Sequence, residues 1–267
     1  MDAAGPLLEV RDLRKEYPIA ASAFAQSERR ATAVAGVGFS LPKGETLGIV
    51  GESGCGKTTL ARMLLRLTEP DAGEIRFQGR DWLAARGAEL RSLRRGMQMV
   101  FQDPAACLNP RMRVGTIVAE PLAIHEAKLS AAERRARAAE ILDAVGLGAD
   151  TLRRYPHEFS GGQRQRIGIA RALILRPHLL IADEPVSALD VSVSAQILDL
   201  LARLRDEFSL TMILISHSLP VVAQLATNVA VMQAGRFVEQ GAAERVLSAP
   251  EHPYTRALLT AVPEIPA

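Results

Sequence analysis

Short apolar runs recur along the chain and alternate with segments of helical periodicity. Each run is four or more residues long and is bounded by polar or turn-forming residues, which is typical of buried strands. The predicted strands are residues 7–17, 33–41, 46–50, 98–101, 179–182, 211–215 and 228–232. We expect a loop at residues 18–32, which are rich in Ala and Ser.

Helices are predicted between these strands from local start signals. Ser130 and Glu133 form a capping box, and Gly146 ends the helix that it opens. Ser160 and Gln163 form a second one, whose helix ends before Pro177. The predicted helices cover residues 59–67, 131–145, 161–176 and 193–208. Strands alternating with helices predict an α/β fold with a mostly parallel sheet covered on both faces.

Two segments depart from this alternation. Pro104, Pro110 and Pro121 argue against one regular element in their segment. Residues 210–235 contain no Asp, Glu, Lys or Arg, but polar residues such as His217 divide them into short pieces. We expect a strand, a short helix and another strand there, rather than a membrane span.

Composition narrows the class of protein. A chain of 267 residues can bury one substantial core, so we expect one domain with a smaller lobe. The net charge of +2, with arginine clusters that no aromatic residues interleave, gives no support for a nucleic-acid partner. Cys55 and Cys107 have neither metal-site nor disulfide spacing, which suits a reducing compartment. Residues 1–6 lack the pattern of a secretory signal.

Residues 51–58, Gly-Glu-Ser-Gly-Cys-Gly-Lys-Thr, fit the phosphate-loop pattern of a glycine, four residues, then Gly-Lys-Ser/Thr. Glycines let backbone N–H groups converge on phosphate oxygens, and the following helix N-terminus adds partial positive charge. Lys57 would reach the β- and γ-phosphates and Thr58 would ligate Mg²⁺. The alternative is an ordinary glycine-rich strand–helix turn. The candidate nucleotide-binding residues here are Gly51, Ser53, Gly54, Cys55, Gly56, Lys57, Thr58 and Thr59.

Asp183 and Glu184 end an apolar strand, where open parallel sheets present ligands. Buried carboxylates there are costly unless a cation or hydrogen bonds compensate them. Asp183 would hold Mg²⁺ through water, and Glu184 would polarise an attacking water molecule. The alternative is two acidic residues that merely start a loop.

Residues 160–163, Ser-Gly-Gly-Gln, have two explanations. The capping box alone accounts for Ser160 and Gln163. A phosphate site would use the same helix N-terminus, with Gly161 and Gly162 allowing close approach.

These three motifs, in this order, resemble the nucleotide-binding subunit of an ATP-binding-cassette (ABC) transporter over nearly the whole chain. The resemblance implies that residues 159–163, with Phe159 in place of the commoner Leu, close over the γ-phosphate held by a partner subunit in a head-to-tail dimer. It also implies roles for four further residues: Gln102 senses Mg²⁺ and couples to the membrane subunits, Asp190 belongs to a loop crossing the dimer interface, His217 contacts the γ-phosphate, and Tyr17 stacks on adenine. Ser218 stands where an acidic residue is common.

The resemblance further implies a division of the chain. We expect a P-loop NTPase core at residues 46–102 and 159–240, with an antiparallel β subdomain at about residues 1–45. An inserted α-helical subdomain would occupy residues 103–158, and a C-terminal tail residues 241–267. The helical subdomain is the expected docking surface for the membrane subunits.

Residues 101–104 with 108–111, and residues 252–259, resemble ATPases of oligopeptide, dipeptide and nickel importers. This implies ATP and Mg²⁺ as cofactors. It also implies two transmembrane permease subunits, a second and distinct ATPase chain, and indirectly an extracytoplasmic substrate-binding protein. The location would be peripheral, on the cytoplasmic face of the membrane. Peptide is the first expected substrate, with nickel or another small solute as the alternative. No cysteine cluster follows the tail, so we expect no iron–sulfur centre.

Two other classes are weighed against this one. A soluble ABC-type ATPase acting on DNA or ribosomes usually carries a coiled-coil insertion or a second cassette, and neither fits in 267 residues. An inactive regulatory cassette is disfavoured because Lys57, Gln102, Asp183, Glu184 and His217 are all present.

Overall fold

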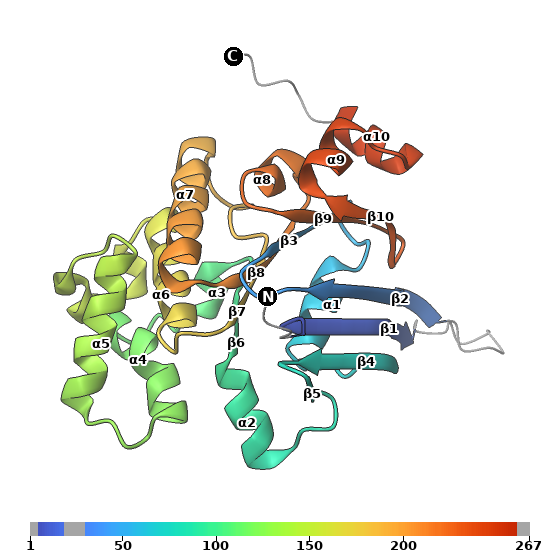
Figure 1. Ribbon diagram of the computed structural model, residues 1–267. Coiled ribbons are helices and arrows are strands. Elements are labelled where there is room, and N and C mark those ends of the chain that lie inside the picture. Colours follow the sequence, from blue (N-terminus) through green and yellow to red (C-terminus); the bar gives the residue numbers. More distant parts are fainter. Residues whose placement is uncertain (1–4, 19–29, 261–267) are drawn as a thin grey trace, which may run out of the picture. The chain divides into compact units, whose positions relative to one another are not determined.

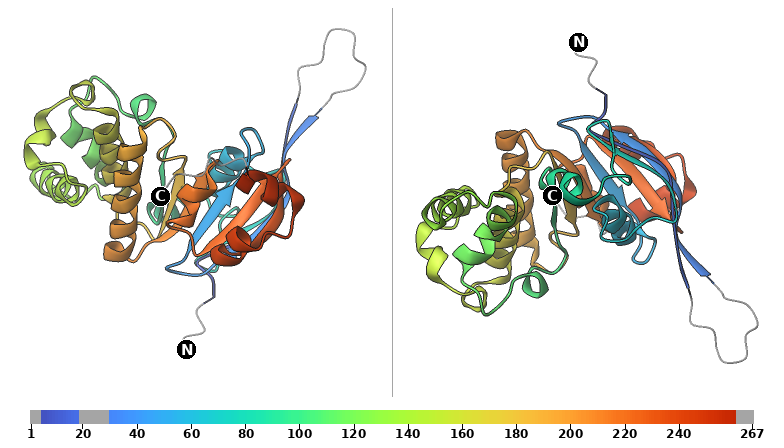
Figure 2. Two further views of the ribbon diagram at one scale, coloured as in Figure 1. Left: turned by 90° about the horizontal axis from the view of Figure 1, so that it is seen from above. Right: turned by 90° about the horizontal axis from the view of Figure 1, so that it is seen from below.

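The computed structural model describes residues 5–18 and 30–260 (Figure 1), which leaves most of the predicted loop at 18–32 and both chain ends outside the described residues. The described chain forms two compact units. It leaves the first unit after Ala85 and returns to it at Leu214. Figure 2 gives two further views of both.

An antiparallel sheet in the order β2-β1-β4-β5 belongs to the first unit. Its strands are β1 (Leu8–Pro18), β2 (Arg30–Leu41), β4 (Ala72–Phe77) and β5 (Arg80–Asp81). Leu8 pairs with Leu41 on one side and with Phe77 on the other, and all three side chains are buried. The alternation of buried and exposed residues in β4 shows one covered face and one polar face.

The first unit also contains β3 (Thr46–Val50), β9 (Asn228–Gln233) and β10 (Arg236–Ala242), in the order β10-β9-β3. β3 runs parallel to β9, with Val50 opposite Val231, and every residue of β3 is buried. Helix α8 (Leu219–Ala223) packs closely on β3: a Cβ at Gly48 would lie 2.0 Å from Val222 Cγ1, so only glycine fits. Helix α1 (Lys57–Leu64) follows β3, while α9 (Ala243–Ser248) and α10 (Pro253–Thr260) follow β10 (Figure 1).

The second unit pairs β6 (Met97–Val100) in parallel with β7 (Leu179–Asp183). Its helices are α2 (Gly87–Arg95), α3 (Pro104–Cys107), α4 (Val114–His125), α5 (Ala131–Ala144), α6 (Gly161–Leu173) and α7 (Val191–Phe208), with 3₁₀ turns η1 (Ala149–Arg153) and η2 (Pro156–Glu158). Two arginines of α6 tie it to the helical segment: Arg171 donates to Cys107 O at 2.7 Å and Arg166 to Val145 O at 2.8 Å. Strand β8 (Thr211–Ser216) carries the chain back toward the first unit.

Most predicted elements agree with the structure. Both capping boxes are formed, at Ser130 and at Ser160. Residues 210–235 form β8, α8 and β9, and no helix among the described residues is both long and apolar enough to cross a bilayer. The predicted helix at 59–67 begins earlier, at Lys57, and ends earlier, at Leu64.

The segment with Pro104, Pro110 and Pro121 is not one regular element, as predicted: it contains α3, a connection and the start of α4. Pro121 lies inside α4, which continues through it to His125. Proline costs a helix one backbone hydrogen bond, but α4 buries Val114, Ile117 and Leu122, and this apolar face outweighs the lost bond. The elements that were not predicted individually are helices α2, α3, α4, α9 and α10 and strands β4, β5 and β10.

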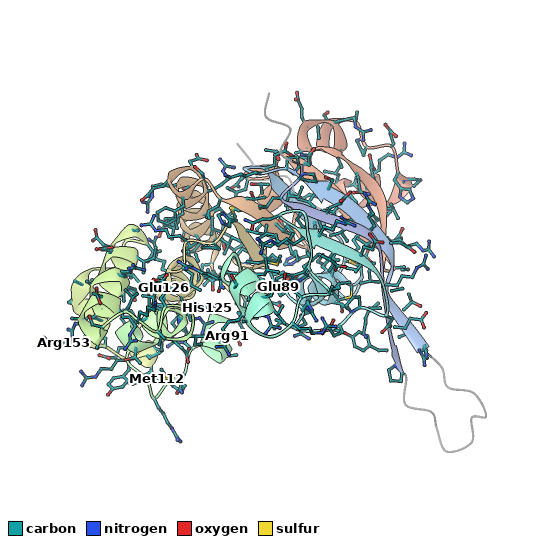
Figure 3. The ribbon with its side chains drawn as sticks, turned by 60° about the horizontal axis from the view of Figure 1, so that its bottom comes forward. Glu89, Arg91, Met112, His125, Glu126 and Arg153 are labelled. Atoms are coloured by element: carbon teal, nitrogen blue, oxygen red, sulfur yellow. The ribbon has the colours of Figure 1, made fainter. Side chains whose placement is uncertain are left out.

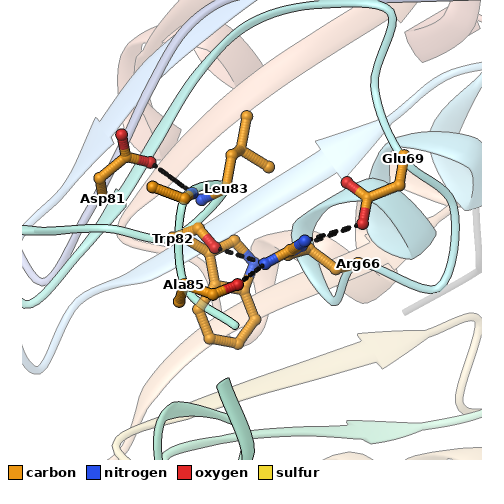
Figure 4. A network of polar contacts seen from close by, with 7 residues as sticks. Arg66, Glu69, Asp81, Trp82, Leu83 and Ala85 are labelled. Carbon is orange, nitrogen blue, oxygen red and sulfur yellow. Dashed lines mark hydrogen bonds and ion pairs between the residues drawn. The ribbon is translucent and has the colours of Figure 1, made fainter. Parts of the chain in front are cut away.

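A buried arginine closes the end of α1 (Figure 4). Arg66 is 7% exposed, and its Nη1 donates to Trp82 O at 2.9 Å and to Ala85 O at 2.8 Å. Its Nη2 pairs with Glu69 Oε1 at 2.9 Å. Arg66 has a φ of 52°, a left-handed conformation at the helix end that glycine usually adopts. The hydrogen bonds of its side chain therefore explain why an arginine, rather than a glycine, occupies this position.

We expect the Arg66→Met variant to lower the free energy of unfolding by about 2–4 kcal/mol, because two buried carbonyl groups lose their donor. Urea unfolding followed by circular dichroism measures this. Glu69→Gln is the matched control: the Glu69 side chain is 64% exposed, so its loss should cost less than about 1 kcal/mol. Equal effects of the two changes would contradict the assignment of the stabilisation to the carbonyl contacts.

Candidate functional site

The predicted phosphate loop joins β3 to α1 in the first unit. Two of its glycines are required by close backbone contacts: a Cβ at Gly51 would lie 2.1 Å from Met232 O, and one at Gly56 would lie 2.1 Å from Ala33 O. Gly54 differs, because a Cβ there would meet no atom within 4 Å, although its φ is 83°. The loop therefore packs against β9 and β2 at both ends and faces open space in its middle.

Lys57, the first residue of α1, is 5% exposed. Its ammonium group donates to Gly51 O at 2.6 Å and to Glu52 O at 2.9 Å, and lies 3.9 Å from Cys55 Sγ. Burial raises the pKa of the Cys55 thiol and Lys57 opposes that shift, so Cys55 stays protonated at neutral pH. A buried cation that donates to loop carbonyls, at a helix N-terminus, is suited to transfer its hydrogen bonds to an anion.

Three further contacts hold the loop from outside. Gly235 N donates to Cys55 O at 2.9 Å, from the turn between β9 and β10. Leu60 N donates to Gly56 O at 2.9 Å, which joins the loop to α1. Glu52 N donates to the Tyr254 hydroxyl at 3.0 Å, from α10. From the sequence, the tail was only a marker of the family, and the contact of Tyr254 was missed because no local pattern predicts it.

Tyr17 and His217 also belong to the first unit. Tyr17 lies near the end of β1 and is 38% exposed, with Lys15 Nζ 5.7 Å from the centre of its ring. An exposed ring of this kind is available for stacking, and its predicted role remains a prediction. His217 follows β8 and is exposed, in a turn where Ser218 N donates to Ser216 Oγ at 3.0 Å.

In the second unit, the parallel pairing of β6 and β7 brings three predicted residues together. Val100 lies opposite Ala182, so the chain following β6 and the carboxyl end of β7 lie at one edge of the pair. There Gln102 Nε2 donates to Glu184 Oε2 at 3.2 Å, and Asp183 beside them is 2% exposed. Glu184 has a φ of 45°, a costly conformation for a non-glycine residue that is often found at functional positions.

The N-terminus of α6 lies against that of α7. Ser160 Oγ accepts from Gln163 N at 3.3 Å, and Ser160 N donates to Gln163 Oε1 at 3.0 Å. A Cβ at Gly162 would lie 2.5 Å from Val193 Cγ1, so helix packing alone demands this glycine. Gly161 is exposed, and Asp190, the exposed N-cap residue of α7, begins the neighbouring helix. Ser160, Gly161 and Gln163 at the start of α6 are exposed, and a helix N-terminus favours an anion.

A groove of about 600 Å³ lies on the helical part of the second unit, lined by residues of α4, α5 and η1. Figure 3 labels Met112 and Arg153 of its lining. Beside it in the same unit, Glu126 accepts from Arg95 and from Arg137, each at 2.6 Å. Burial, with Arg95 and Arg91 close by, lowers the pKa of His125, which is therefore neutral at pH 7. The arginines of the groove are Arg113, Arg134, Arg135 and Arg153.

The motifs imply two bound groups, a nucleotide and Mg²⁺. Open space over Gly54, a helix N-terminus and a buried ammonium group fit a nucleotide phosphate chain. Mg²⁺ prefers a few protein ligands combined with phosphate oxygens and water. Thr58 in the first unit and Asp183 in the second each carry an oxygen of the kind that Mg²⁺ prefers, and the described part of the chain contains no group of three or more His, Cys, Asp or Glu residues arranged to hold a metal.

Comparisons with known proteins agree with the motifs. A family model described as "ABC transporter" matches residues 34–187, and one described as "Oligopeptide/dipeptide transporter, C-terminal region" matches residues 238–267. Dipeptide transport ATP-binding protein DppF of Haemophilus influenzae is 50% identical over 97% of this chain and 79% of its own length. Oligopeptide transport ATP-binding protein AppF of Bacillus subtilis is 51% identical over 96% of this chain and 78% of its own length.

Solved structures of ATP-binding cassettes have a similar fold. The ATP-binding cassette MJ0796, in a dimeric post-hydrolysis state bound to ADP and Pi, matches with a TM-score of 0.77 and 28% identity, covering 88% of this chain and 98% of its own. CbiO1 from Clostridium perfringens, part of the ABC transporter complex cbiONQ, matches with the same score and identity over 92% of both chains. The predicted α/β fold, with a mostly parallel sheet, an antiparallel β subdomain and a helical region, is confirmed.

One tight glycine of the loop, Gly56, and the open one, Gly54, yield a matched pair of variants. Gly56→Ala should lower the free energy of unfolding by about 2–5 kcal/mol, because it adds a backbone clash to the cost of a positive φ. Gly54→Ala, with a positive φ and no neighbour to clash with, should cost about 1–2 kcal/mol. Urea unfolding of both variants under one set of conditions measures the difference, and the reverse order would show that the loop backbone is not held against β2.

Proposed function

Because the chain belongs to the ABC transporter family, as an ATPase subunit, we propose that it powers the import of peptides through a membrane complex. One observation carries the choice of peptide: the tail at residues 238–267 matches the C-terminal region of oligopeptide and dipeptide transporters. The two relatives reported above, both about half identical to this chain, are named for dipeptide and oligopeptide transport, which supports the same choice.

The phosphate loop supplies the binding part of the mechanism. Backbone N–H groups of the loop and the N-terminus of α1 would bind the phosphates, and Lys57 would exchange its bonds to Gly51 O and Glu52 O for bonds to the β- and γ-phosphates. Thr58 would ligate Mg²⁺, whose charge, when the ion is bound, stabilises negative charge on the phosphates. The remaining residues of this proposed site are Gly51, Ser53, Gly54, Cys55, Gly56 and Thr59 from the loop and α1, with Tyr17 against adenine.

Gln102, Asp183 and Glu184 supply the hydrolytic part. Glu184 would accept a proton from a water molecule and so orient it for in-line attack on the γ-phosphate. In the structure its carboxylate accepts a hydrogen bond from Gln102, so the amide would have to release or share it as water enters. Asp183, almost fully buried, would hold Mg²⁺ through water, and His217 would contact the γ-phosphate.

Partner subunits complete the proposed assembly. Ser160, Gly161, Gly162 and Gln163, with Asp190, would face the nucleotide of a second and distinct ATPase in a head-to-tail dimer. Two transmembrane permease subunits would dock on the helical subdomain at residues 103–158, within which the arginine-lined groove lies. A substrate-binding protein would act outside the membrane, and this chain would be peripheral on the cytoplasmic face. We propose no nucleic-acid partner.

The proposed division of the chain follows the same family. Residues 1–45 would form the antiparallel β subdomain and residues 46–102 with 159–240 the ATPase core, around the helical subdomain at 103–158 and before the tail at 241–267. The antiparallel sheet of β2, β1, β4 and β5 supports the first of these and also includes residues beyond 45, up to Asp81.

We expect Glu184→Gln to bind ATP like the wild type and to lose hydrolysis by about 10²-fold or more, because the amide cannot take a proton from water. Steady-state phosphate release and binding of a fluorescent ATP analogue measure the two properties. Lys57→Ala is the counterpart, which should lose most ATP affinity. Unchanged hydrolysis by Glu184→Gln would show that Glu184 takes no part in the reaction. Unchanged ATP binding by Lys57→Ala would refute the proposed phosphate-binding function of the loop.

The transporter assignment is tested by purifying the tagged chain from its native membranes in detergent and identifying co-purifying proteins by mass spectrometry. We expect two permease subunits and a second ATPase. Replacing Arg134 and Arg135 in the groove by glutamate should reduce recovery of the permeases. Replacing Arg203 and Arg205 on α7, outside the groove, by glutamate is the control and should leave the recovery unchanged. Recovery of no membrane protein by the wild type, with ATPase activity intact, would overturn the importer assignment.

A further inference from the structure

A tyrosine of the C-terminal segment touches the phosphate loop. Glu52 N donates to the Tyr254 hydroxyl at 3.0 Å, across 202 positions of sequence and within the first unit. We propose that Tyr254 is a positioning residue of the ATPase, whose hydroxyl holds the start of the phosphate loop in the conformation that binds nucleotide. The proposal rests on the proposed function of the loop, and it assigns to the tail a part in nucleotide binding.

Tyr254 is itself held by a chain of polar contacts that begins in β10. Glu239 on β10 is 8% exposed, and its carboxylate accepts from Glu251 N at 2.9 Å and from His252 N at 3.1 Å. Burial raises the pKa of Glu239, but the backbone donors outweigh it and keep the pKa below the usual value, so the group is ionised at neutral pH. His252 Nδ1 then accepts from Tyr254 N at 3.2 Å. The start of α10 is therefore fixed to the sheet, and Tyr254 with it.

On the loop side, both backbone polar groups of Glu52 are engaged. Its carbonyl oxygen accepts from Lys57 Nζ at 2.9 Å, and its N–H donates to Tyr254. When phosphate draws the Lys57 donors away, the carbonyl loses this partner and the contact with Tyr254 still holds the residue. Burial raises the pKa of the Tyr254 phenol, opposed by its bond to Glu52, so the hydroxyl remains a neutral acceptor through the physiological range.

The expected effect follows from preorganisation. A loop that is already held in its bound conformation loses less conformational entropy when nucleotide binds. Loss of one hydrogen bond that holds the loop should therefore weaken nucleotide binding about three- to tenfold. The loop would hold ATP and ADP through the phosphates they share, so both affinities should fall together. Since the bond is made before and after the chemical step, KM should rise while kcat stays close to the wild-type value.

The test uses the full-length chain with Tyr254→Phe, which removes only the hydroxyl, and Tyr155→Phe in the other unit as the matched control. The affinities for fluorescent ATP and ADP analogues and steady-state hydrolysis give the Kd, KM and kcat. Hydrogen–deuterium exchange of the peptide covering residues 48–56 reports the Glu52 amide directly. We expect weaker binding of both nucleotides, a raised KM, and faster exchange in this peptide, with wild-type values for Tyr155→Phe.

Wild-type nucleotide affinity in Tyr254→Phe would overturn the proposal, whether or not exchange in the peptide covering residues 48–56 changes. A second variant, Tyr254→Ala, separates the hydroxyl from the ring: if only this variant weakens binding, the ring and not the hydrogen bond positions the loop, and the proposal fails. Lys57→Ala in the same assays keeps the two hypotheses apart. If Lys57→Ala binds nucleotide normally, the phosphate-loop function itself is refuted. If it loses binding while Tyr254→Phe does not, only the role of Tyr254 is refuted.

Discussion

The candidate nucleotide site depends on two places where one backbone lies against another without a side chain between them. Gly51 lies against Met232 O of β9, and Gly56 against Ala33 O of β2. Each contact leaves no room for a Cβ, so the loop is shaped by strands from two different sheets of the first unit. That packing fixes the course of the loop backbone, whereas a loop fixed only by its own sequence would have to be ordered by the ligand. The glycine pattern therefore has a steric cause as well as a chemical one.

The second unit contains two arrangements that cost free energy, a buried carboxylate and a strained backbone. Asp183 is almost completely buried at the end of β7, and Glu184 follows it in a left-handed conformation. Neither arrangement favours stability, because burying a carboxylate and straining a non-glycine residue both cost free energy. Stability alone would favour an apolar residue and a glycine. The parallel pairing of β6 with β7, which sets Gln102 beside Glu184, supplies part of the compensation through the hydrogen bond between them.

The sequence alone predicted those features of the structure whose physical cause lies in neighbouring residues. The capping boxes at Ser130 and Ser160 involve residues three positions apart, and both helices begin as predicted. The prolines correctly predicted that residues 104–121 are not one regular element, but they did not show that α4 continues through Pro121, because its buried face is set by neighbours that are distant in sequence. The approach of Gln102 to Glu184 needs the pairing of two strands 82 residues apart, and no periodicity reports it. The packing of Gly162 against Val193 was equally hidden, although Gly162 was selected for another reason.

The tail lies outside the residues that match the general ABC transporter model, but it contacts the phosphate loop, which lies within them. The general match covers residues 34–187, which include the loop, whereas the match to peptide transporters begins at residue 238. Within the first unit, the second segment reaches the first through Glu239, His252 and Tyr254. A hydroxyl placed on a phosphate loop can change how tightly nucleotide binds, but it cannot read the side chains of a peptide. The proposed role of Tyr254 therefore concerns the binding of nucleotide and not the recognition of the transported solute.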